Sequence, residues 1–233
     1  MELARKNEEL ERFAFISSHD LKTPLIPIIG FSELLSQEIS TYDRPELQEY
    51  TQHINQAAHR MFHIIEDVLE YSSLHDTEKD TSIETIDLVE LINDIELSIK
   101  RKLSKKDISI VFEGSLYKIE EHKASIYSIF QNLIENGLHY NKSPKPEIII
   151  KTRQTNDNIF MTFKDNGIGI PKSKFEDIFK MFHRIHNEKE YPGTGLGLAI
   201  VAKVVRELQG KISVESDLNK GSIFSIIIPK REA

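Results

Sequence analysis

Apolar residues recur at helical spacing along two successive stretches of the chain, residues 3–40 and 47–68. In steps of 100° per residue from Leu10, the first stretch places one set of side chains within about 60° of a line. This set is Phe13, Ala14, Ser17, Leu21, Pro24, Ile28, Phe31, Leu35 and Ile39. The second stretch repeats the pattern at Leu47, Tyr50, Ile54, Ala57, Ala58, Met61, Ile64, Ile65 and Val68. Residues 41–45 separate the two stretches, so the sequence predicts a helical hairpin.

One hairpin cannot cover both of these apolar seams. Two copies that pair into a four-helix bundle cover them, so we expect a homodimer. After residues 75–82 the pattern changes, and short apolar runs typical of strands alternate with amphipathic helical stretches. Strands are expected at residues 83–86, 108–112, 147–153, 159–164, 211–215 and 223–228, and helices at 88–102, 122–140 and 196–209. The predicted fold is α+β: the hairpin, then an α/β sandwich whose mixed sheet is largely antiparallel.

The distribution of charge also divides the chain. Residues 1–80 carry a net charge of −9 and residues 81–233 a net charge of +2, so we predict two domains with these bounds. Neither part is basic enough for a nucleic-acid surface. The chain has no cysteine, and no apolar run approaches the roughly 20 residues that cross a bilayer. We therefore expect a cytoplasmic protein without a membrane segment of its own.

The first chemical motif is the segment around His19 on the expected first helix. His19 and Thr23 lie about 180° and 220° from the apolar seam, so both face solvent. A surface histidine is commonly without function. Two features favour a function here: Asp20 can orient or deprotonate the imidazole, and Pro24 inside a helix costs about 3 kcal/mol.

The second motif lies on the expected helix at residues 122–140. Asn132, Asn136, His139 and Tyr140 are spaced i, i+4, i+7 and i+8, which places them on one helix face. Asparagine disfavours helix interiors, and its amide oxygen suits a hard cation such as Mg²⁺. Taken alone, the pattern is equally compatible with a solvated helix face.

Two glycine clusters form the third and fourth motifs, at residues 165–169 and 193–197. Their glycines permit a positive φ and a close approach of backbone N–H groups to phosphate, and the second cluster begins a helix. The chain lacks the Gly-Lys-Ser/Thr of a P-loop and the spacing of a dinucleotide-binding strand and helix. Phe175, Phe179, Phe182 and the polar residues 184–190 lie between the clusters, as expected of a cover over a nucleotide.

These four motifs, in this order, resemble those of the histidine kinases of two-component signalling. Residues 19–24 resemble the H box, 132–140 the N box, 165–169 the G1 box, 175–182 the F box and 193–197 the G2 box. The last three and the N box belong to an ATPase fold shared with gyrase, Hsp90 and MutL. Gly221-Ser222-Ile223-Phe224 resembles the closing Gly-Thr-x-Phe, with serine in place of threonine.

The resemblance implies roles for the residues that transfer phosphate. His19 would attack the γ-phosphate of ATP, with Asp20 as its acid/base partner. Arg184 would stabilise the charge on the phosphoryl group during its transfer. In related kinases, a polar residue at the position of Thr23 orients the water that dephosphorylates the receiver aspartate.

The resemblance also implies an ATP site with Mg²⁺. Asn136 would hold Mg²⁺, Asn132 would help to place the phosphates, and Asp165 would accept a hydrogen bond from the adenine amino group. The remaining nucleotide-binding residues on this basis are His139, Tyr140, Gly167, Gly169, Gly193, Thr194, Gly195, Leu196, Gly197 and Ser222. Where the N box often has lysine, this chain has His139. Gly137 replaces the commoner alanine at a cost of about 1 kcal/mol in helix propensity.

The partners implied are a second copy of the chain and a response-regulator receiver domain, which accepts the phosphoryl group on an aspartate. A sensor domain would precede residue 1 in a longer protein. Two rival interpretations remain: an ATPase of the gyrase and Hsp90 type, and a non-catalytic dimeric scaffold. His19 argues against the first, and the intact Asn136, Asp165 and Gly195 argue against the second.

Overall fold

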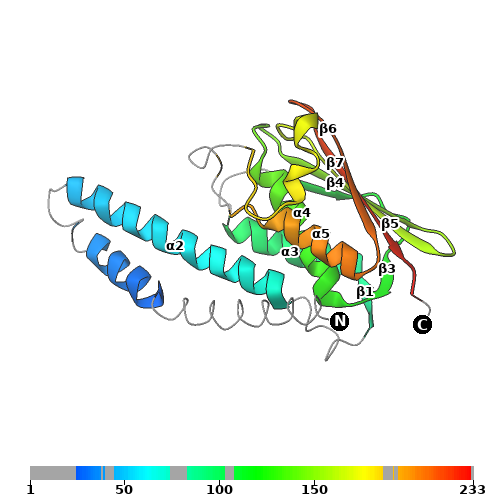
Figure 1. Ribbon diagram of the computed structural model, residues 1–233, viewed down its shortest axis with the longest axis horizontal. Helices are drawn as coiled ribbons and strands as arrows, with labels where there is room; N and C mark the ends of the chain where they lie inside the picture. The colour runs from blue at the N-terminus through cyan, green and yellow to red at the C-terminus, as the bar shows by residue number, and fades with distance from the viewer. Residues whose placement is uncertain are drawn as a thin grey trace, which may run out of the picture. The chain divides into compact units, whose positions relative to one another are not determined.

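The computed structural model describes residues 25–37, 39, 45–73, 83–102, 108–185, 191 and 194–231. The chain forms two compact units, Met1–Glu78 and Lys79–Ala233. Figure 1 shows a pair of helices in the first unit and a sheet with helices in the second. Each unit is described by itself below.

The first unit contains the two helices of the predicted hairpin. Residues 25–37 are helical, and α2 runs over Pro45–Ser73. Pro45 occupies the first helical position, where its fixed φ suits the helix and its missing N–H costs nothing. Leu25 of the first helix shares a buried cluster with Ala58 and Ile65 of α2. The hairpin is therefore confirmed, while the helix expected over residues 3–24 lies outside the described residues.

The two predicted seams differ in how the folded hairpin uses them. The first helix contributes Leu25 and the partly buried Ile29 to the core of the hairpin, rather than the seam line through Ile28, whereas α2 contributes Ala58 and Ile65 of its predicted seam. Phe31 is 70% exposed and Ile54 of α2 is 50% exposed. Among the described seam residues, the large apolar side chains that are exposed are Ile28, Phe31, Leu35, Leu47, Tyr50, Ile54 and Met61. Two helices cover only one flank of so wide an apolar stripe, so the other flank stays open in a single chain.

The second unit is a sheet with helices on one face (Figure 1). Its elements are β1 (Glu84–Asp87), α3 (Leu88–Lys102), β2 (Ser109–Phe112), β3 (Lys118–Glu121), α4 (Lys123–His139), β4 (Glu147–Gln154), β5 (Asn158–Asp165), α5 (Gly197–Glu207), β6 (Lys211–Asp217) and β7 (Gly221–Pro229), with short 3₁₀ turns η2 (Lys172–Lys174) and η3 (Asp177–Phe179). Five strands pair in the order β2-β4-β5-β7-β6. Only β2 and β4 run parallel, and the other neighbours are antiparallel, which confirms the mixed, largely antiparallel sheet.

Alternating side chains bury one face of this sheet. Along β5 the side chains of Ile159, Met161 and Phe163 are buried, as a half-covered strand requires. Phe163 meets the fully buried Phe130 of α4 edge to face, with ring centroids 4.9 Å apart. Aromatic pairs in this geometry add to the stabilisation that burial provides. The core thus fixes α4 against the sheet, and α4 carries the predicted N-box residues.

The short strand β3 is absent from the sequence-based prediction. It pairs with β1 in a separate two-stranded sheet, with Ile86 opposite Ile119. Its last residue, Glu121, is 1% exposed and forms an ion pair with Arg231, with 3.1 Å between Oε2 and Nε. The segment after β7 is therefore attached to β3 by a buried charge.

Candidate functional site

A cavity opens between the carboxyl-terminal half of α4, the end of β5 and the first turn of α5. It is lined by Asn136, Gly137, Tyr140, Asp165, Ile168, Gly169, Ile170, Ile178, His183, Arg184, Ile185, Leu198, Ser222 and Phe224. Most of this lining is apolar, with a few polar groups that converge on the same space. Small-molecule sites have this composition.

Asp165 provides the polar group at the end of β5. Its Oδ1 accepts the backbone N–H of Gly167 at 2.8 Å and that of Ser222 at 3.2 Å. Burial raises the pKa of this carboxyl group, and the two backbone hydrogen bonds oppose the rise. The result is a fixed, nearly buried acceptor, which suits a ligand that donates a hydrogen bond.

The glycines after Asp165 allow a tight turn between two other segments. A Cβ at Gly167 would lie 2.5 Å from the backbone oxygen of Tyr140. Gly169 has φ +72°, and a Cβ there would lie 2.1 Å from the backbone oxygen of Asp217. The close approaches that require these glycines are thus to the protein backbone, and Gly169 also lines the cavity.

Two asparagines of α4 lie against the first turn of α5. A Cβ at Gly197 would meet Oδ1 of Asn132 at 2.7 Å and Nδ2 of Asn136 at 3.5 Å. Asn132 donates its Nδ2 to the backbone oxygen of Ser128 at 3.0 Å, so its Oδ1 is directed toward α5. Amide oxygens and the N–H groups at a helix start are suited to a hard cation and to phosphate, respectively.

The other two N-box residues differ in position. Tyr140 lines the cavity, and its pKa is raised by burial. His139 is exposed and is not among the lining residues; its ring meets that of Tyr140 edge to face at 4.9 Å. Gly137 has a packing reason: a Cβ there would lie 2.4 Å from Cδ1 of Ile148 and 3.1 Å from Cβ of Asp165.

The G2 segment packs against the residues around Arg184. Gly195 has φ +75°, and a Cβ there would lie 3.1 Å from Cγ of Arg184 and 3.2 Å from the backbone oxygen of His183. Thr194 Oγ1 accepts the backbone N–H of Leu196 at 3.3 Å. Leu196, assigned to the nucleotide site, is fully buried in the core.

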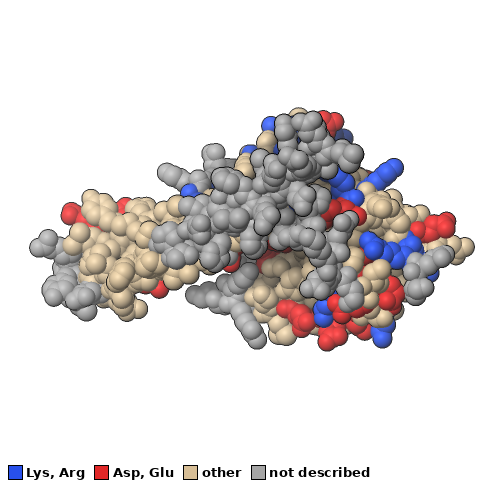
Figure 2. All heavy atoms as spheres, turned by 60° about the horizontal axis from the view of Figure 1, so that its bottom comes forward, with Lys and Arg blue, Asp and Glu red and all other residues tan. Residues whose placement is uncertain are grey.

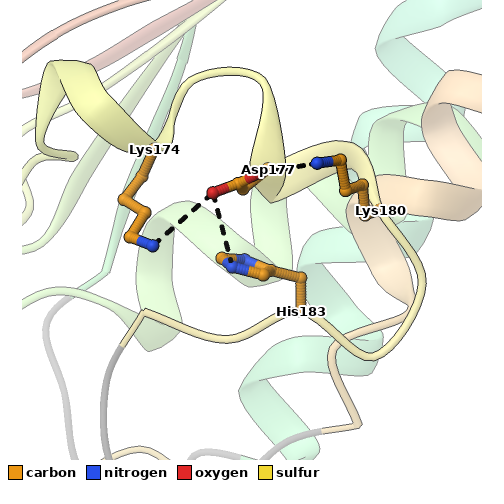
Figure 3. A network of polar contacts seen from close by, with 4 residues as sticks. All are labelled: Lys174, Asp177, Lys180 and His183. Carbon is orange, nitrogen blue, oxygen red and sulfur yellow. Dashed lines mark hydrogen bonds and ion pairs between the residues drawn. The ribbon is translucent and has the colours of Figure 1, made fainter.

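Asp177 organises the segment that corresponds to the F box (Figure 3). Its carboxylate accepts Nζ of Lys180 at 2.7 Å and Nζ of Lys174 at 3.5 Å, and lies 3.8 Å from Nε2 of His183. The hydrogen bond from Lys180 is the main cause that lowers the pKa of Asp177. The cluster holds His183 and the start of the Arg184 segment beside the cavity.

Several lining residues were not found from the sequence. Ile178, His183 and Ile185 carry no local pattern that marks them as part of a cavity. Conversely, His19, Asp20, Thr23 and Gly193 lie outside the described residues. Their predicted roles remain predictions.

The residues present fit a magnesium nucleotide through amide oxygens. Within the described residues no group of three or more His, Cys, Asp or Glu side chains is arranged to hold a metal. Mg²⁺ commonly takes only one or two protein ligands and completes its shell with phosphate and water. Asn136 at the cavity fits that role.

In the described part of the chain, no helix is long and apolar enough to span a membrane.

Both halves of the chain match models of known families. Residues 9–77 match the His Kinase A (phospho-acceptor) domain. Residues 121–232 match the histidine kinase-, DNA gyrase B- and HSP90-like ATPase. The order of the two matches agrees with the order of the motifs.

Individual proteins give the same result. Phytochrome-like protein Cph1 of Synechocystis sp. is 32% identical over 227 residues, which are 97% of this chain and 30% of that protein. Full-length ShkA in complex with AMPPNP gives a TM-score of 0.73 at 21% identity, covering 95% of this chain and 46% of its own. Histidine kinase ThkA in complex with response regulator protein TrrA gives a TM-score of 0.64 at 24% identity, and the match covers 99% of this chain and 66% of the ThkA chain. The two structures support the fold, and the chain spans less than a third of the length of Cph1. With both family models matched in order, the chain belongs to the histidine kinases and comprises the catalytic core of a two-component sensor histidine kinase.

Proposed function

We propose that this chain is an ATP-dependent kinase that phosphorylates its own His19 and passes the phosphoryl group to an aspartate of a receiver domain. One observation carries the proposal. A single chain joins a phosphoacceptor domain at residues 9–77 to an ATPase domain whose cavity is lined by a nearly buried carboxylate, Asp165.

Adenine recognition is the role we assign to Asp165. The adenine amino group donates a hydrogen bond, whereas guanine has a carbonyl at the same place and offers only an acceptor. A carboxylate accepts but does not donate, so the site favours adenine. The apolar walls formed by Ile168, Ile170 and Phe224 suit a flat base.

The phosphates are assigned to the opposite part of the cavity, near Asn136 and the first turn of α5. Asn136 would hold Mg²⁺, which neutralises charge on the phosphate oxygens, and Asn132 would help to place the phosphates. The backbone N–H groups around Gly195 and Gly197 face phosphate at a helix start, where partial positive charge gathers. Arg184 at the cavity adds a fixed charge for the transferring group.

The transfer step is a substitution at phosphorus. A ring nitrogen of His19 attacks the γ-phosphorus, the bond to the β–γ bridging oxygen breaks, and ADP leaves. Asp20 orients the imidazole and accepts its proton. The phosphohistidine then loses the same group to a carboxylate oxygen of the receiver aspartate. ThkA, which has the same fold, is bound to a response regulator in its structure, which supports this partner class.

The exposed seam of the hairpin supports a homodimer. Ile28, Phe31 and Ile54 are each about half exposed or more in a single chain. The face of the hairpin in view in Figure 2 has few charged side chains. A second copy would cover these side chains and form a four-helix bundle. Because the chain spans 30% of Cph1, we also propose that a sensor domain precedes it in a longer protein.

Labelling with γ-³²P-ATP tests the proposal. The chain is expected to become labelled, and the label to be lost in acid and kept in base, as for a phosphoramidate. His19→Gln should abolish labelling while ATP binding persists. His63→Gln, which removes an exposed histidine of α2, is the matched control and should be labelled normally. Labelling of His19→Gln would exclude His19 as acceptor, and ATP hydrolysis without labelling would favour a gyrase-type ATPase.

A further inference from the structure

Tyr191 is a buried aromatic residue beside the cavity that no motif assigns. Only 6% of it is exposed. Its ring lies 5.2 Å from the ring of Tyr140, tilted by 38°, and 5.9 Å from that of His139. Nζ of Lys142 lies 5.5 Å from the centre of the Tyr191 ring. Three residues at the end of α4 and just after it therefore hold this ring.

The backbone of Tyr191 contacts a different group, the guanidinium of Arg184. Nη2 of Arg184 donates to the backbone oxygen of Tyr191 at 2.5 Å. The stem of the same side chain lies against Gly195, where a Cβ would come within 3.1 Å of Cγ. Arg184 is thus restrained at its stem and at its head, and it lines the cavity.

We propose that Tyr191 is a positioning residue, which fixes Arg184 so that its guanidinium is oriented toward the terminal phosphate of the bound nucleotide. The inference rests on the proposed function. The ring supplies the anchor on Tyr140 and His139, and the carbonyl supplies the restraint on the guanidinium.

The chemistry of arginine makes such a restraint useful. A guanidinium has five N–H donors in one plane, so a hydrogen bond to a fixed carbonyl sets the orientation of the whole plane. A free arginine side chain loses much rotamer freedom when it binds phosphate, and a side chain already held loses less.

Substitutions at Tyr191 separate the ring from the hydroxyl. Tyr191→Phe keeps the anchor and is expected to stay within about twofold of the parent chain in every measurement. Tyr191→Ala keeps the carbonyl but releases it, so kcat for labelling of His19 should fall about 5- to 10-fold. The affinity for ADP should stay unchanged in calorimetry, while the affinity for the non-hydrolysable analogue AMPPNP should fall by a similar factor. Tyr117→Ala removes an exposed tyrosine of the same domain and serves as the control.

A second background tests whether the effect passes through Arg184. In Arg184→Met, the further change Tyr191→Ala is expected to have no additional effect on kcat or on AMPPNP affinity. Additive losses in the double variant, or an equal loss of ADP and AMPPNP affinity in Tyr191→Ala, would overturn the proposal. If Tyr191→Ala does not fold, Tyr191→Leu and Lys142→Met weaken the same anchor and must show the same selective loss.

The two proposals fail in different ways. If the parent chain is not labelled on His19, the kinase proposal fails. The difference between ADP and AMPPNP affinities in the Tyr191 variants still decides the role of Tyr191, because it needs no phosphoryl transfer.

Discussion

Oδ1 of Asp165 accepts the backbone N–H of Ser222 across 57 residues of sequence, which joins the end of β5 to the start of β7 at the cavity. Asp165→Asn can keep this acceptor atom, but it replaces the other carboxylate oxygen with a donor. We predict that adenine nucleotides bind more weakly by about 1–3 kcal/mol. The amide nitrogen that replaces a carboxylate oxygen is a donor, so it cannot accept a hydrogen bond from the adenine amino group. Calorimetry with ADP measures the loss, and affinity equal to that of the parent chain would argue against an adenine contact.

Asp165→Asn is expected to raise the thermal stability of the nucleotide-free chain, although it weakens nucleotide binding. Burial raises the pKa of Asp165 above its ordinary value of 3.8, so the folded chain keeps a proton that the unfolded chain has lost. The free energy of unfolding therefore falls as pH rises through the interval between the two pKa values, and the loss persists above it. Without nucleotide, Asp165→Asn should melt higher than the parent chain at neutral pH, with the difference shrinking in acid.

Asp177→Asn provides a control of opposite sign for that experiment. The pKa of Asp177 is lowered, mainly by the hydrogen bond from Lys180. Its stabilising contribution is present above the unfolded pKa and is lost as pH falls through the folded one. Asp177→Asn should therefore melt slightly lower than the parent chain at neutral pH and equally in acid. If both variants shifted the melting temperature in the same direction, the opposite pKa shifts of Asp165 and Asp177 would be contradicted.

Asn136→Ala should weaken nucleotide binding only when Mg²⁺ is present. The amide oxygen is the group proposed for the cation, and its loss is expected to lower Mg-ATP affinity about tenfold, or ~1.4 kcal/mol. Titrations with and without Mg²⁺ distinguish a cation ligand from a general packing effect. Gln131→Ala removes another α4 amide, which bonds to Glu135, and should bind normally. An equal loss with and without the cation would remove Asn136 as its ligand.

The exposed seam predicts that the chain, and a fragment of residues 1–80, are dimers in solution. Ile54→Glu places a charge where we expect the second copy, so the dissociation constant should rise about 100-fold or more. Ile26→Glu, at a site that is 61% exposed on another face of its helix, should leave the dimer intact. Sedimentation measures both. A parent chain that is monomeric at high micromolar concentration would contradict the four-helix bundle.

Thr23→Ala is expected to separate two activities at one surface. The hydroxyl can orient a water for the receiver aspartate but contributes little to attack by the imidazole of His19. Labelling of His19 should persist, while dephosphorylation of the receiver slows about tenfold, equivalent to ~1.4 kcal/mol. The two rates are measured on the same preparation. If both fell together, Thr23 would instead have a structural role beside Pro24.

The predictions succeeded where local pattern decides structure. The alternation in β5 and the amphipathic pattern of α4 each report one buried face, so both elements were found. β3 was missed because Ile119 is its single apolar residue and its partner β1 lies more than 30 residues away. The helical wheel predicted the apolar seam through Ile28. It could not show whether that seam packs within the same chain or against a second copy.

In the candidate site, too, local sequence patterns identified some residues and contacts between separate segments determine the others. Asp165, which the resemblance to the G1 box assigned to the nucleotide site, lines the cavity, and the glycines that follow it occupy positions where a tight turn needs them. Tyr191 and His183 were missed because their positions depend on the packing of Gly195 against Arg184 and on the contact with Tyr140. These contacts join segments that are distant in sequence, and no periodicity of either segment encodes them.

The ion pair between Glu121 and Arg231 sets a limit on how far the chain can be shortened. Removing residues from position 231 onward would leave the carboxylate of Glu121, 1% exposed, without its cationic partner. Burial of a charge without its partner is unfavourable, so the shortened domain is expected to be less stable. A minimal version made for crystallisation or inhibitor screening should therefore retain Arg231, although the residue lies beyond β7 and outside the box motifs.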